Sequence, residues 1–390
     1  MADTADIVIV GGGIIGTSIA CQLAARGHGR GVVLLERDTL GSGSTGRSAG
    51  GIRSQFSTEI NIRFSLESVA VWRHFEDLFG TSVDYHEHGY LFLAQTAAER
   101  TQFERNIALQ NRLGVPSRLL EPSDIDALVP GLRTDDLTAA AYNAEDGGAG
   151  PNDATQAFAR RARAGGVEIR ERSPVTSIEV AEGRVQAVVT AAGRLATRRV
   201  VIASGAWAGP VGRLAGVELP VQPYRRELFV SEPFDALPAQ IPLVIDLHVG
   251  WYVRREGPGV LMSGARDTEP SFNTHVDWGG LPRIAALASH RLPALASARF
   301  GGRAWAGLYD VSPDDHAIMG PVPEVDGLYC AVGFSGHGFQ HSPAAGRLMA
   351  ELVLDGRTTG IDIRPLGLER FARGELLHEP LTAHAGSFAG

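Results

Sequence analysis

The apolar positions at the start of the chain follow first the pattern of a strand, then that of a helix, and then that of a strand again. Residues 7–10 (IVIV) form a short β-branched run, which predicts a buried strand. Residues 14–25 place apolar and small side chains at the spacing of a helix, and residues 32–35 (VVLL) form a second buried run. A strand, a helix and a second strand in this succession are typical of the βαβ unit of a Rossmann-like domain.

Three glycines join the first predicted strand to the helix. Gly11, Gly13 and Gly16 have the spacing G-x-G-x-x-G, which allows a tight turn, a close approach of pyrophosphate and close packing of helix on strand. The N-terminus of the helix then faces the phosphates with its partial positive charge. Glu36 ends the second strand, where its carboxylate can accept hydrogen bonds from ribose hydroxyls. The pattern therefore predicts a dinucleotide site.

A long loop of small residues follows Glu36. Residues 41–53 read GSGSTGRSAGGIR and offer many backbone N–H groups and hydroxyls, which suit an extended cofactor. A nicotinamide enzyme would be expected to continue with regular alternation of strands and helices. The loop therefore favours FAD over NAD, although a flexible linker has a similar composition.

The rest of the chain alternates between helical and strand-rich blocks. Helices are predicted over residues 64–79, 97–113, 153–164 and 281–290, with another opening at residue 121 and a last one ending near residue 354. Strands are predicted over residues 86–95, 167–170, 175–180, 184–190, 199–203 and 328–332, and residues 217–310 are otherwise mostly strands. This alternation predicts a nucleotide domain built from three separated pieces, with a second domain inserted between them.

Composition excludes several classes of protein. All 36 residues counted as Lys+Arg are arginines, so the 390-residue chain has no lysine. It can therefore form neither a Schiff base through lysine nor a complete phosphate-binding P-loop. A net charge of −8 argues against a partner nucleic acid, and no apolar stretch is long enough to span a membrane.

The two cysteines and the N-terminal segment indicate the cellular compartment in which the protein is expected. Cys21 and Cys330 lie far apart in the sequence and form no disulfide framework, which fits a reducing environment. The first residues lack the basic region that precedes the apolar run of a signal peptide. We therefore expect a cytoplasmic protein.

Six stretches carry a resemblance to a known family. They are VIVGGGIIG with LLE, GSTGRSAGGIR, VVIASGAWA, WAGLYDVSPDDHAIMG, GLYCAVGFSGHGF and DIRPLGLERF, in family order over nearly the whole chain. Together they resemble the FAD-dependent D-amino-acid oxidase superfamily, in its branch of sarcosine oxidase, dimethylglycine dehydrogenase and glycine oxidase-like proteins. The resemblance implies oxidation of a C–N bond by hydride transfer to the flavin, which gives an imine that hydrolyses.

The same resemblance implies a fold of class α/β + β. A Rossmann-like FAD-binding domain would carry an inserted substrate domain with a large antiparallel sheet, and the flavin would lie at their interface. We expect the FAD-binding domain at residues 1–82, 143–216 and 322–372, the substrate domain at 83–142 and 217–321, and a C-terminal tail at 373–390.

The resemblance also implies which residues contact the flavin. They are Gly11, Gly13, Ile14, Ile15, Gly16, Glu36, Arg37, Ser44, Thr45, Arg47, Ser48, Ala49, Gly50, Gly51, Val175, Ser204, Gly205, Trp207, Gly307, Gly333, Gly336, His337, Gly338, Phe339 and Gln340. Relatives that attach the flavin covalently use a His at position 47 or a Cys at position 307. This chain has Arg47 and Gly307 there, so we predict noncovalent FAD.

Four residues are implied on the substrate side. Arg53 aligns with an Arg near the substrate carboxylate of sarcosine oxidases, although a structural ion pair is the alternative. Tyr252 and Tyr309 are the hydroxyls expected to line the pocket, and each could instead belong to the core. Gln340 stands where sarcosine oxidases have a carboxylate-binding lysine, and Tyr309 where glycine oxidases have an arginine. A secondary amine, or an N-substituted or cyclic amino acid, therefore fits at least as well as a plain α-amino acid.

The oxygen-activating lysine of sarcosine oxidases is also missing. Met262 takes its place by alignment, with a tolerance of one residue. Slow reaction with oxygen is therefore expected, and a dehydrogenase with another electron acceptor, unless Arg254, Arg255 or Arg266 supplies the charge.

Other polar clusters have plainer interpretations. His337 and His341 are spaced i, i+4 but lack the carboxylate of an H-E-x-x-H motif, so no metal is predicted. Asp314 and Asp315 follow a proline and predict a turn rather than a catalytic pair.

Two functions from different classes remain open. The leading hypothesis is an FAD-dependent amine or amino-acid dehydrogenase or oxidase acting on a small molecule. The alternative is a flavin-binding accessory or assembly protein, because one branch of the family linked to respiratory-complex assembly shares the GFSGHG segment. A narrower version of the enzyme is a catalytic β-type subunit that passes electrons to a partner chain.

Overall fold

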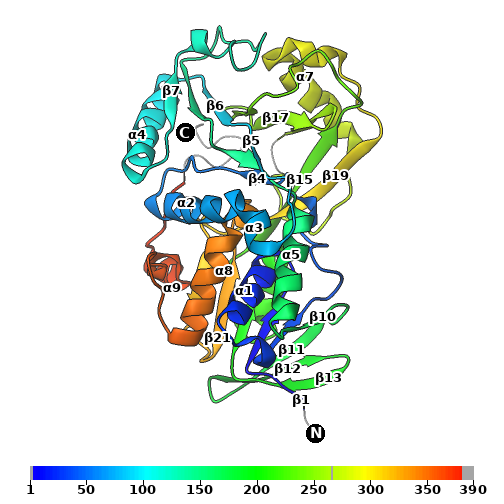
Figure 1. Cartoon of the computed structure of the whole chain (residues 1–390), viewed down its shortest axis with the longest axis vertical. Helices are drawn as coiled ribbons and strands as arrows, with labels where there is room; N and C mark the ends of the chain where they lie inside the picture. Colours follow the sequence, from blue (N-terminus) through cyan, green and yellow to red (C-terminus); the bar gives the residue numbers. More distant parts are fainter. Residues whose placement is uncertain (1–2, 265–266, 380–390) are drawn as a thin grey trace.

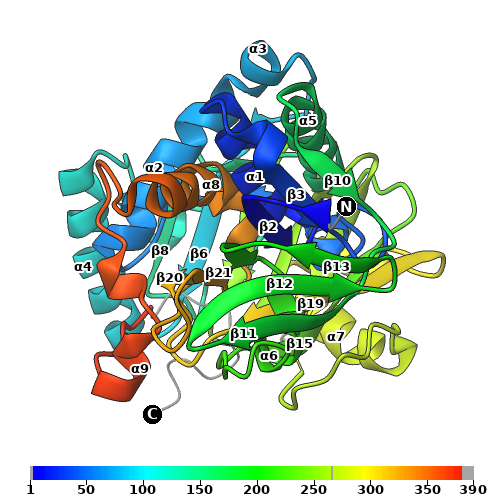
Figure 2. The ribbon, with the colours of Figure 1, turned by 90° about the horizontal axis from the view of Figure 1, so that it is seen from below.

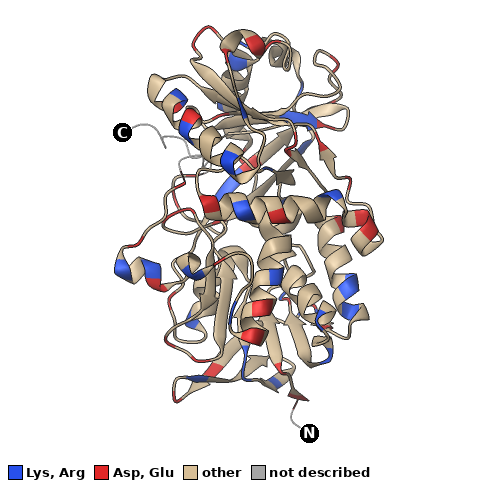
Figure 3. Cartoon of the chain, turned by 60° about the vertical axis from the view of Figure 1, so that its left-hand side comes forward, with Lys and Arg blue, Asp and Glu red and all other residues tan. Residues whose placement is uncertain are grey.

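Two large sheets divide the molecule into two halves (Figure 1). The structure is a computed structural model that describes residues 3–264 and 267–379. In Figure 1 the lower half contains the six-stranded sheet with long helices beside it, and the upper half contains the eight-stranded sheet. Figure 3 shows basic and acidic residues interspersed over the ribbons of both halves.

The six-stranded sheet joins strands from three separate parts of the chain. Its order is β10-β3-β2-β14-β21-β20, in which β20 runs antiparallel to β21 and the other neighbours are parallel. The strands are β10 (Glu168–Arg170), β3 (Val32–Leu35), β2 (Ile7–Val10), β14 (Val200–Ile202), β21 (Leu328–Val332) and β20 (Ile318–Pro321). Every residue of β2, β3 and β14 is buried, as expected of parallel strands covered on both faces.

Helices cover one face of this sheet and a small sheet covers the other. The helices are α1 (Ile14–Ala25), α5 (Pro151–Ala164) and α8 (Gly338–Asp355). Helix α8 approaches α1 closely at Gly346, where a Cβ would overlap the side chain of Ser18. On the other face, seen in Figure 2, lies the four-stranded sheet of β1 (Asp3–Thr4), β13 (Gly193–Ala196), β12 (Arg184–Thr190) and β11 (Val175–Ala181).

The eight-stranded sheet has the order β19-β15-β18-β17-β16-β6-β8-β7 and is antiparallel apart from the β16–β6 pair. Helix α7 (Leu281–Arg291) packs on one face, and α4 (Ala97–Leu113) lies over the other. The strands are β19 (Arg303–Val311), β15 (Gln222–Val230), β18 (Gly259–Ser263), β17 (Trp251–Glu256), β16 (Leu243–Asp246), β6 (Tyr90–Ala94), β8 (Ala139–Asn143) and β7 (Arg118–Leu120).

A three-stranded sheet lies between the halves, made of β4 (Gly51–Ile52), β9 (Gly147–Gly148) and β5 (His86–Glu87). We propose the domain division expected from the sequence, with one change. Residues 318–321 form β20 of the six-stranded sheet, so we move them from the substrate domain to the FAD-binding domain.

Two predicted helices differ in the structure. The helix expected over residues 64–79 is two helices, α2 (Glu59–Arg73) and α3 (Phe75–Phe79), because the backbone at His74 leaves the helical conformation. The helix expected to open at residue 121 is a single 3-10 turn, Pro122–Asp124. No helix in the described part of the chain combines the length and the apolar character needed to cross a membrane.

The segment after Pro313 is more than a turn. Asp315 has a φ of 58° and makes the predicted turn, but Asp314 is buried and pairs in two places with Arg370 of α9 (Glu369–Arg373). Arg370 Nε lies 2.7 Å from Asp314 Oδ2, and Nη2 lies 2.8 Å from Oδ1. Burial opposes the ionisation of Asp314, but the hydrogen bonds from Arg370 outweigh it and hold its pKa below the usual value.

Removing Arg370 should therefore destabilise the fold. Arg370→Met leaves a buried carboxylate without its charged partner, and we expect a loss of about 3–5 kcal/mol in the free energy of unfolding. Urea unfolding monitored by tryptophan fluorescence measures it. The loss should shrink as the pH falls through the lowered pKa of Asp314, because the protonated acid no longer needs the cation.

Arg373→Met on the same helix is the matched control, since Arg373 is exposed and lies 4.0 Å from the equally exposed Glu375. It should cost less than about 1 kcal/mol. Equal effects of the two substitutions would contradict the importance of the buried pair.

Candidate active site

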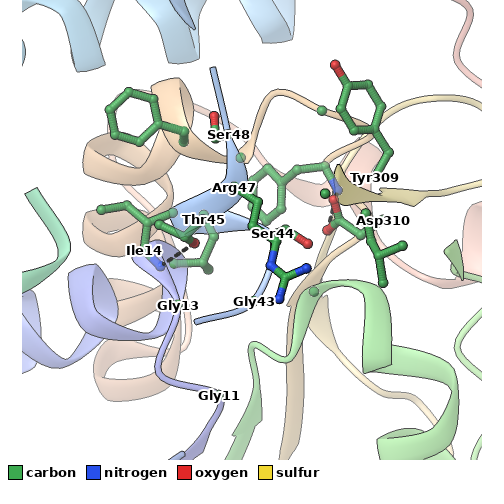
Figure 4. A pocket seen from close by; sticks show the side chains of 18 of the residues that line it. Gly11, Gly13, Ile14, Gly43, Ser44, Thr45, Arg47, Ser48, Tyr309 and Asp310 are labelled. Atoms are coloured by element: carbon green, nitrogen blue, oxygen red, sulfur yellow. Dashed lines mark hydrogen bonds between the residues drawn. The ribbon is translucent and has the colours of Figure 1, made fainter. Parts of the chain in front are cut away.

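A cavity of about 470 Å³ lies where the two large sheets meet. Its lining begins at the carboxyl ends of β2, β3, β14 and β21 and continues to the eight-stranded sheet, on the face that carries Tyr90, Phe92, Leu228 and Tyr252. The carboxyl edge of a parallel sheet is where α/β folds place their ligands. Figure 4 shows part of the cavity lining, with labelled residues from the glycine-rich turn (Gly11, Gly13), the following loop (Ser44, Thr45) and β19 (Tyr309).

The turn from β2 into α1 forms the nucleotide end of the cavity. Gly11 has a φ of 118°, and a side chain there would overlap the backbone of Ala203, so only glycine fits. Thr45 Oγ1 accepts a hydrogen bond of 3.1 Å from the Ile14 N–H, which joins the glycine-rich loop to the start of α1 (Figure 4). The start of a helix at this edge suits a phosphate group.

Glu36 lies at the same end of the cavity. Its carboxylate accepts hydrogen bonds from the Gly12 N–H at 2.6 Å and from the Asp38 N–H at 2.9 Å. These bonds fix the carboxylate in the lining, where a ribose hydroxyl could reach it. Nearby, the Arg37 guanidinium stacks on Trp207 with its carbon 3.9 Å from the ring centroid, and both residues line the cavity.

Two buried hydroxyls in the lining suggest a polar ligand. Ser44 Oγ and Ser204 Oγ have no hydrogen-bond partner within the described residues. Buried hydroxyls are normally paired, so both are available to the oxygens of a bound group. With the helix start and Glu36, these residues fit the pyrophosphate and ribose of FAD.

A tight turn from Gly333 to Gly338 borders the middle of the cavity. Ser335 and Gly336 have φ values of 52° and 93°, and the Tyr309 ring packs so closely on Gly336 that a Cβ would lie 2.6 Å from it. Asp310 Oδ2 accepts a 3.1 Å hydrogen bond from the Phe334 N–H. Burial raises the pKa of Asp310 to about 6. Helix α8 begins directly after this turn, so its N-terminus faces the cavity.

Arg53 and Gln340 form a unit on the wall of the cavity. Gln340 Oε1 accepts from the Arg53 N–H at 3.2 Å, and Gln340 Nε2 donates to the Arg53 carbonyl oxygen at 2.9 Å. The Arg53 side chain donates to the Gln55 carbonyl oxygen and lies 3.1 Å from His337 Nε2. The amide of Gln340 thus holds the backbone of Arg53, and the geometry favours a positioning role for it.

Arg226 is a cavity residue that the sequence analysis missed. It is 2% exposed and lies on β15 with its guanidinium carbon 4.8 Å from the Tyr252 ring centroid and 5.6 Å from that of Tyr309. Strand alternation was the available signal, since two successive arginines must point to opposite faces. Arg225 faces the other side and pairs with Asp267 at 2.8 Å.

The cavity contains most of the predicted site residues. Arg53, Tyr252, Tyr309 and Gln340 all line it, as do most of the predicted flavin contacts. Three predicted glycines are missing from the described lining, because they shape the backbone behind it: Gly16 against Gly11, Gly50 against Ala149, and Gly333 against Ser312. Lining residues that were not predicted include Tyr90, Phe92, Arg226, Leu228 and Asp310.

The position aligned with the oxygen-activating lysine does not face the cavity. Met262 points into the core beneath α7, on the face of the sheet away from the cavity. The next residue, Ser263, faces Arg226 and accepts a 3.1 Å hydrogen bond from its Nε. Arg254 and Arg255 donate to the carbonyl oxygens of Ala49 and Phe234, whereas Arg266 lies outside the described residues.

His337 and His341 have separate surroundings. His337 lines the cavity with its ring edge toward Phe56, and His341 lies behind it, 2.9 Å from Ser65 Oγ. Burial lowers the pKa of His341 to about 3, so this ring is neutral. Across the described ranges, no group of three or more His, Cys, Asp or Glu side chains is arranged to hold a metal ion.

This fold and this cavity define a two-domain dinucleotide-dependent protein, and comparisons with known proteins identify the family. The family described as FAD dependent oxidoreductase matches residues 6–352. FAD-dependent oxidoreductase domain-containing protein 1 of Xenopus laevis is 34% identical over 97% of this chain and 84% of its own length. The mitochondrial dimethylglycine dehydrogenase of Rattus norvegicus is 30% identical over 91% of this chain, but the match spans 43% of that protein.

A solved structure gives the same result. L-Proline dehydrogenase from P. horikoshii is 34% identical, with a TM-score of 0.89, and the match covers 97% of this chain and 100% of that chain. The chain therefore belongs to the FAD dependent oxidoreductase family, and FAD is its cofactor. The predicted family resemblance and the predicted fold class are confirmed.

Glu36 provides a test of how FAD is held. In Glu36→Gln, an NH2 group replaces one of the two carboxylate oxygens, each of which accepts a hydrogen bond from a backbone N–H. The substitution also removes the negative charge that would bind the ribose hydroxyls. We expect FAD to dissociate at least about tenfold more readily. Titration of FAD into the deflavinated protein, followed by tryptophan quenching, measures the dissociation constant.

Glu171→Gln is the matched control. Glu171 Oε1 also accepts a backbone hydrogen bond, from Leu40 at 2.7 Å, but Glu171 is not part of the described lining of the cavity. FAD affinity should stay within about twofold of the wild type in this variant, since no cofactor contact changes. Equal weakening by both substitutions would show that Glu36 acts only on the local backbone.

Proposed function

We propose that this protein oxidises the C–N bond of a small secondary amine, or of an N-substituted or cyclic amino acid resembling proline, sarcosine or dimethylglycine. The observation that carries the proposal is the cavity, in which nucleotide-binding features at one end continue into an apolar wall with a buried guanidinium at the other. The names of the relatives support it, since one is an L-proline dehydrogenase and another a dimethylglycine dehydrogenase.

Bound FAD would accept the hydride that leaves the carbon atom next to the amine nitrogen. The backbone of the turn from Gly333 to Gly338 and the start of α8 would hold the polar edge of the ring system by N–H groups and by the helix dipole. Phe92, Leu243 and Ile245 form an apolar wall that would exclude water from the reacting atoms.

The amine is expected to react as the neutral base. Hydride transfer from a neutral amine needs no side chain to remove a proton. The apolar wall would assist the reaction, because a desolvated site disfavours the charged ammonium form of the amine. The Tyr252 hydroxyl is protonated near neutral pH, since burial raises its pKa further, to about 12, and as a donor it is proposed to hydrogen-bond the substrate.

The flavin is proposed to be held without a covalent bond. The two positions used for covalent attachment in relatives touch each other, since a Cβ at Gly307 would lie 3.0 Å from the Cβ of Arg47. Neither residue carries a nucleophilic atom. Cys21 and Cys330 are buried thiols whose pKa is raised by desolvation, to about 11 and about 12, so they are poor nucleophiles and fit the reducing, cytoplasmic setting that we also propose.

Acid precipitation tests the noncovalent assignment. We expect the yellow colour to remain in the supernatant when the protein is precipitated with trichloroacetic acid, because unfolding removes every contact to FAD. Chromatography of the supernatant should give intact FAD in a molar ratio near one. A yellow pellet with a colourless supernatant would show covalent attachment.

Anaerobic reduction tests the proposed reaction. The purified holoprotein is mixed in a stopped-flow instrument with L-proline, sarcosine and dimethylglycine, with glycine and with amine-free buffer as controls. We expect at least one secondary or tertiary amine to bleach the flavin absorbance and to yield the oxidised imine or its hydrolysis product. Bleaching by none of a broad panel would instead favour the accessory or assembly role.

Reoxidation of the reduced protein by air then separates dehydrogenase from oxidase. Because the chain has no lysine that could lie above the flavin, we propose slow reoxidation by air and an electron acceptor other than oxygen, such as a partner subunit. Reoxidation at the rate of a true oxidase would contradict this part of the proposal. Copurification with a second redox chain would favour the β-type subunit.

A further inference from the structure

One buried carboxylate, that of Asp146, ties down the loop that carries Arg53. Asp146 lies in the turn from β8 to β9, at the junction of the two halves, and is fully buried. Its Oδ1 accepts a hydrogen bond from the Ser54 N–H at 2.7 Å, and its Oδ2 accepts one from Gln55 Nε2 at 3.0 Å. The carboxylate therefore binds the two residues that directly follow Arg53.

The other contacts of Asp146 come from the eight-stranded sheet and its neighbouring turn. Asn143 Nδ2, at the end of β8, donates to the same Oδ1 at 2.8 Å. The Asp146 carbonyl oxygen accepts hydrogen bonds from the N–H groups of His88 and Gly89, at 3.2 and 2.7 Å, in the turn from β5 to β6. Because β6 and β8 both belong to the eight-stranded sheet, Asp146 connects this sheet to the loop that carries Arg53.

The amide of Gln55 requires the carboxyl group to act as an acceptor. Gln55 Nε2 donates to Asp146 Oδ2 and also to the Tyr90 carbonyl oxygen, at 3.1 Å. Gln55 Oε1 is buried and has no hydrogen-bond partner among the described residues. The two acceptors on the nitrogen side therefore orient the amide. A proton on Asp146 Oδ2 would leave two donors facing each other and would cost the bond to Gln55.

The surroundings of Asp146 place its ionisation near neutral pH. Removal from water raises the pKa of its carboxyl group to about 7, although the hydrogen bonds and the positive charge of Arg53 oppose this rise. Burial raises the pKa values of the Tyr90 and Tyr142 hydroxyls and lowers that of His88 to about 4, so these neighbours are neutral in this range. The carboxylate therefore prevails above about pH 7 and the protonated acid below it.

We infer that Asp146 is a positioning residue, whose ionised carboxylate holds the loop of Arg53 in the place that lets the cavity bind its small-molecule ligand. Arg53 and Tyr90 line the cavity, whereas Asp146 is not part of its described lining and acts on both through Gln55 and the loop backbone. The inference rests on the proposed function, since the ligand is taken to be a small amine or amino acid.

The pH dependence of ligand binding tests the inference without turnover. Pyrrole-2-carboxylate, which stays ionised over the range used, is titrated into the FAD-loaded protein between about pH 5.5 and 8.5, and the change in flavin absorbance reports binding. The wild type should bind this probe about tenfold more tightly at the upper end of the range. The reason is that one of the three hydrogen bonds to the Asp146 side chain is lost when the acid is protonated.

Asp146→Asn should remove the part of this pH dependence that comes from Asp146. The variant presents an NH2 group to Gln55 at every pH, so it should bind the probe about tenfold more weakly than the wild type at high pH and equally at low pH. A residue that only stabilises the fold would weaken binding by the same factor throughout. Asp310, whose pKa is raised to about 6, is present in both proteins and affects both profiles alike.

Asn143→Leu keeps the test open if Asp146→Asn does not fold. It removes one donor to the carboxylate and leaves the loop unchanged, so the pH at which affinity falls should rise by about 0.5–1 unit. Asp126→Asn is the matched control. Asp126 is exposed, its Oδ1 accepts a hydrogen bond of 2.8 Å from the Gly131 N–H, and it lies outside the described lining, so this variant should keep the wild-type profile.

Several outcomes would overturn the inference. They are a wild type that binds the probe equally at both ends of the pH range or not at all, an Asp146→Asn variant that keeps the wild-type profile or is weakened equally at every pH, and an Asn143→Leu variant with an unmoved midpoint. The proposed function fails separately, when no amine reduces the flavin at any pH. A protein that an amine reduces, but that binds the probe independently of pH, would retain the function and lose this role of Asp146.

Discussion

The contact between Arg47 and β19 ties the two sheets together at the cavity. Trp305 Nε1 donates to the Arg47 carbonyl oxygen at 2.9 Å, and Arg47 Nη1 donates to the Ala306 carbonyl oxygen at 3.2 Å. Between them Gly307 leaves no side chain, so the loop of the FAD-binding domain lies directly on the strand of the other sheet. Two hydrogen bonds from side chains to main-chain oxygens, and the close approach at Gly307, therefore set the spacing between the loop that lines the nucleotide end and the eight-stranded sheet.

Local motifs were predictable from the sequence because their residues carry their own conformational demands. Gly11 with its positive φ, and the buried β-branched strands beside it, gave the nucleotide half of the cavity and Glu36 within it. The substrate half depends on which face of a strand each residue takes, and on strands far apart in the sequence. Strand alternation puts Arg225 and Arg226 on opposite faces of β15, but only the folded sheet tells which of the two faces the cavity. Met262, which aligns with the lysine, lies in the core on the other face of the sheet.

Because the chain has no lysine, arginine takes the buried positions that need a permanent positive charge, and the buried arginines make different contacts. Arg370 neutralises Asp314 and holds the C-terminal segment, while Arg53 is bound into the loop that carries it. Arg226 stands against the apolar wall of the cavity. Gln340 shows the converse case, since an amide at the position of a charged residue can pair with both the N–H and the carbonyl of one backbone residue, which a lysine cannot do.

The central claim is that one continuous cavity holds FAD at the Glu36 end and has room for a small amine or amino acid against the eight-stranded sheet. A crystal structure of the FAD-loaded protein with pyrrole-2-carboxylate tests it most directly. We predict a ribose within hydrogen-bond distance of Glu36 and the pyrrole ring of the probe against the apolar wall of Phe92, Leu243 and Ile245. A ribose away from Glu36, or a probe bound outside the cavity, would contradict it.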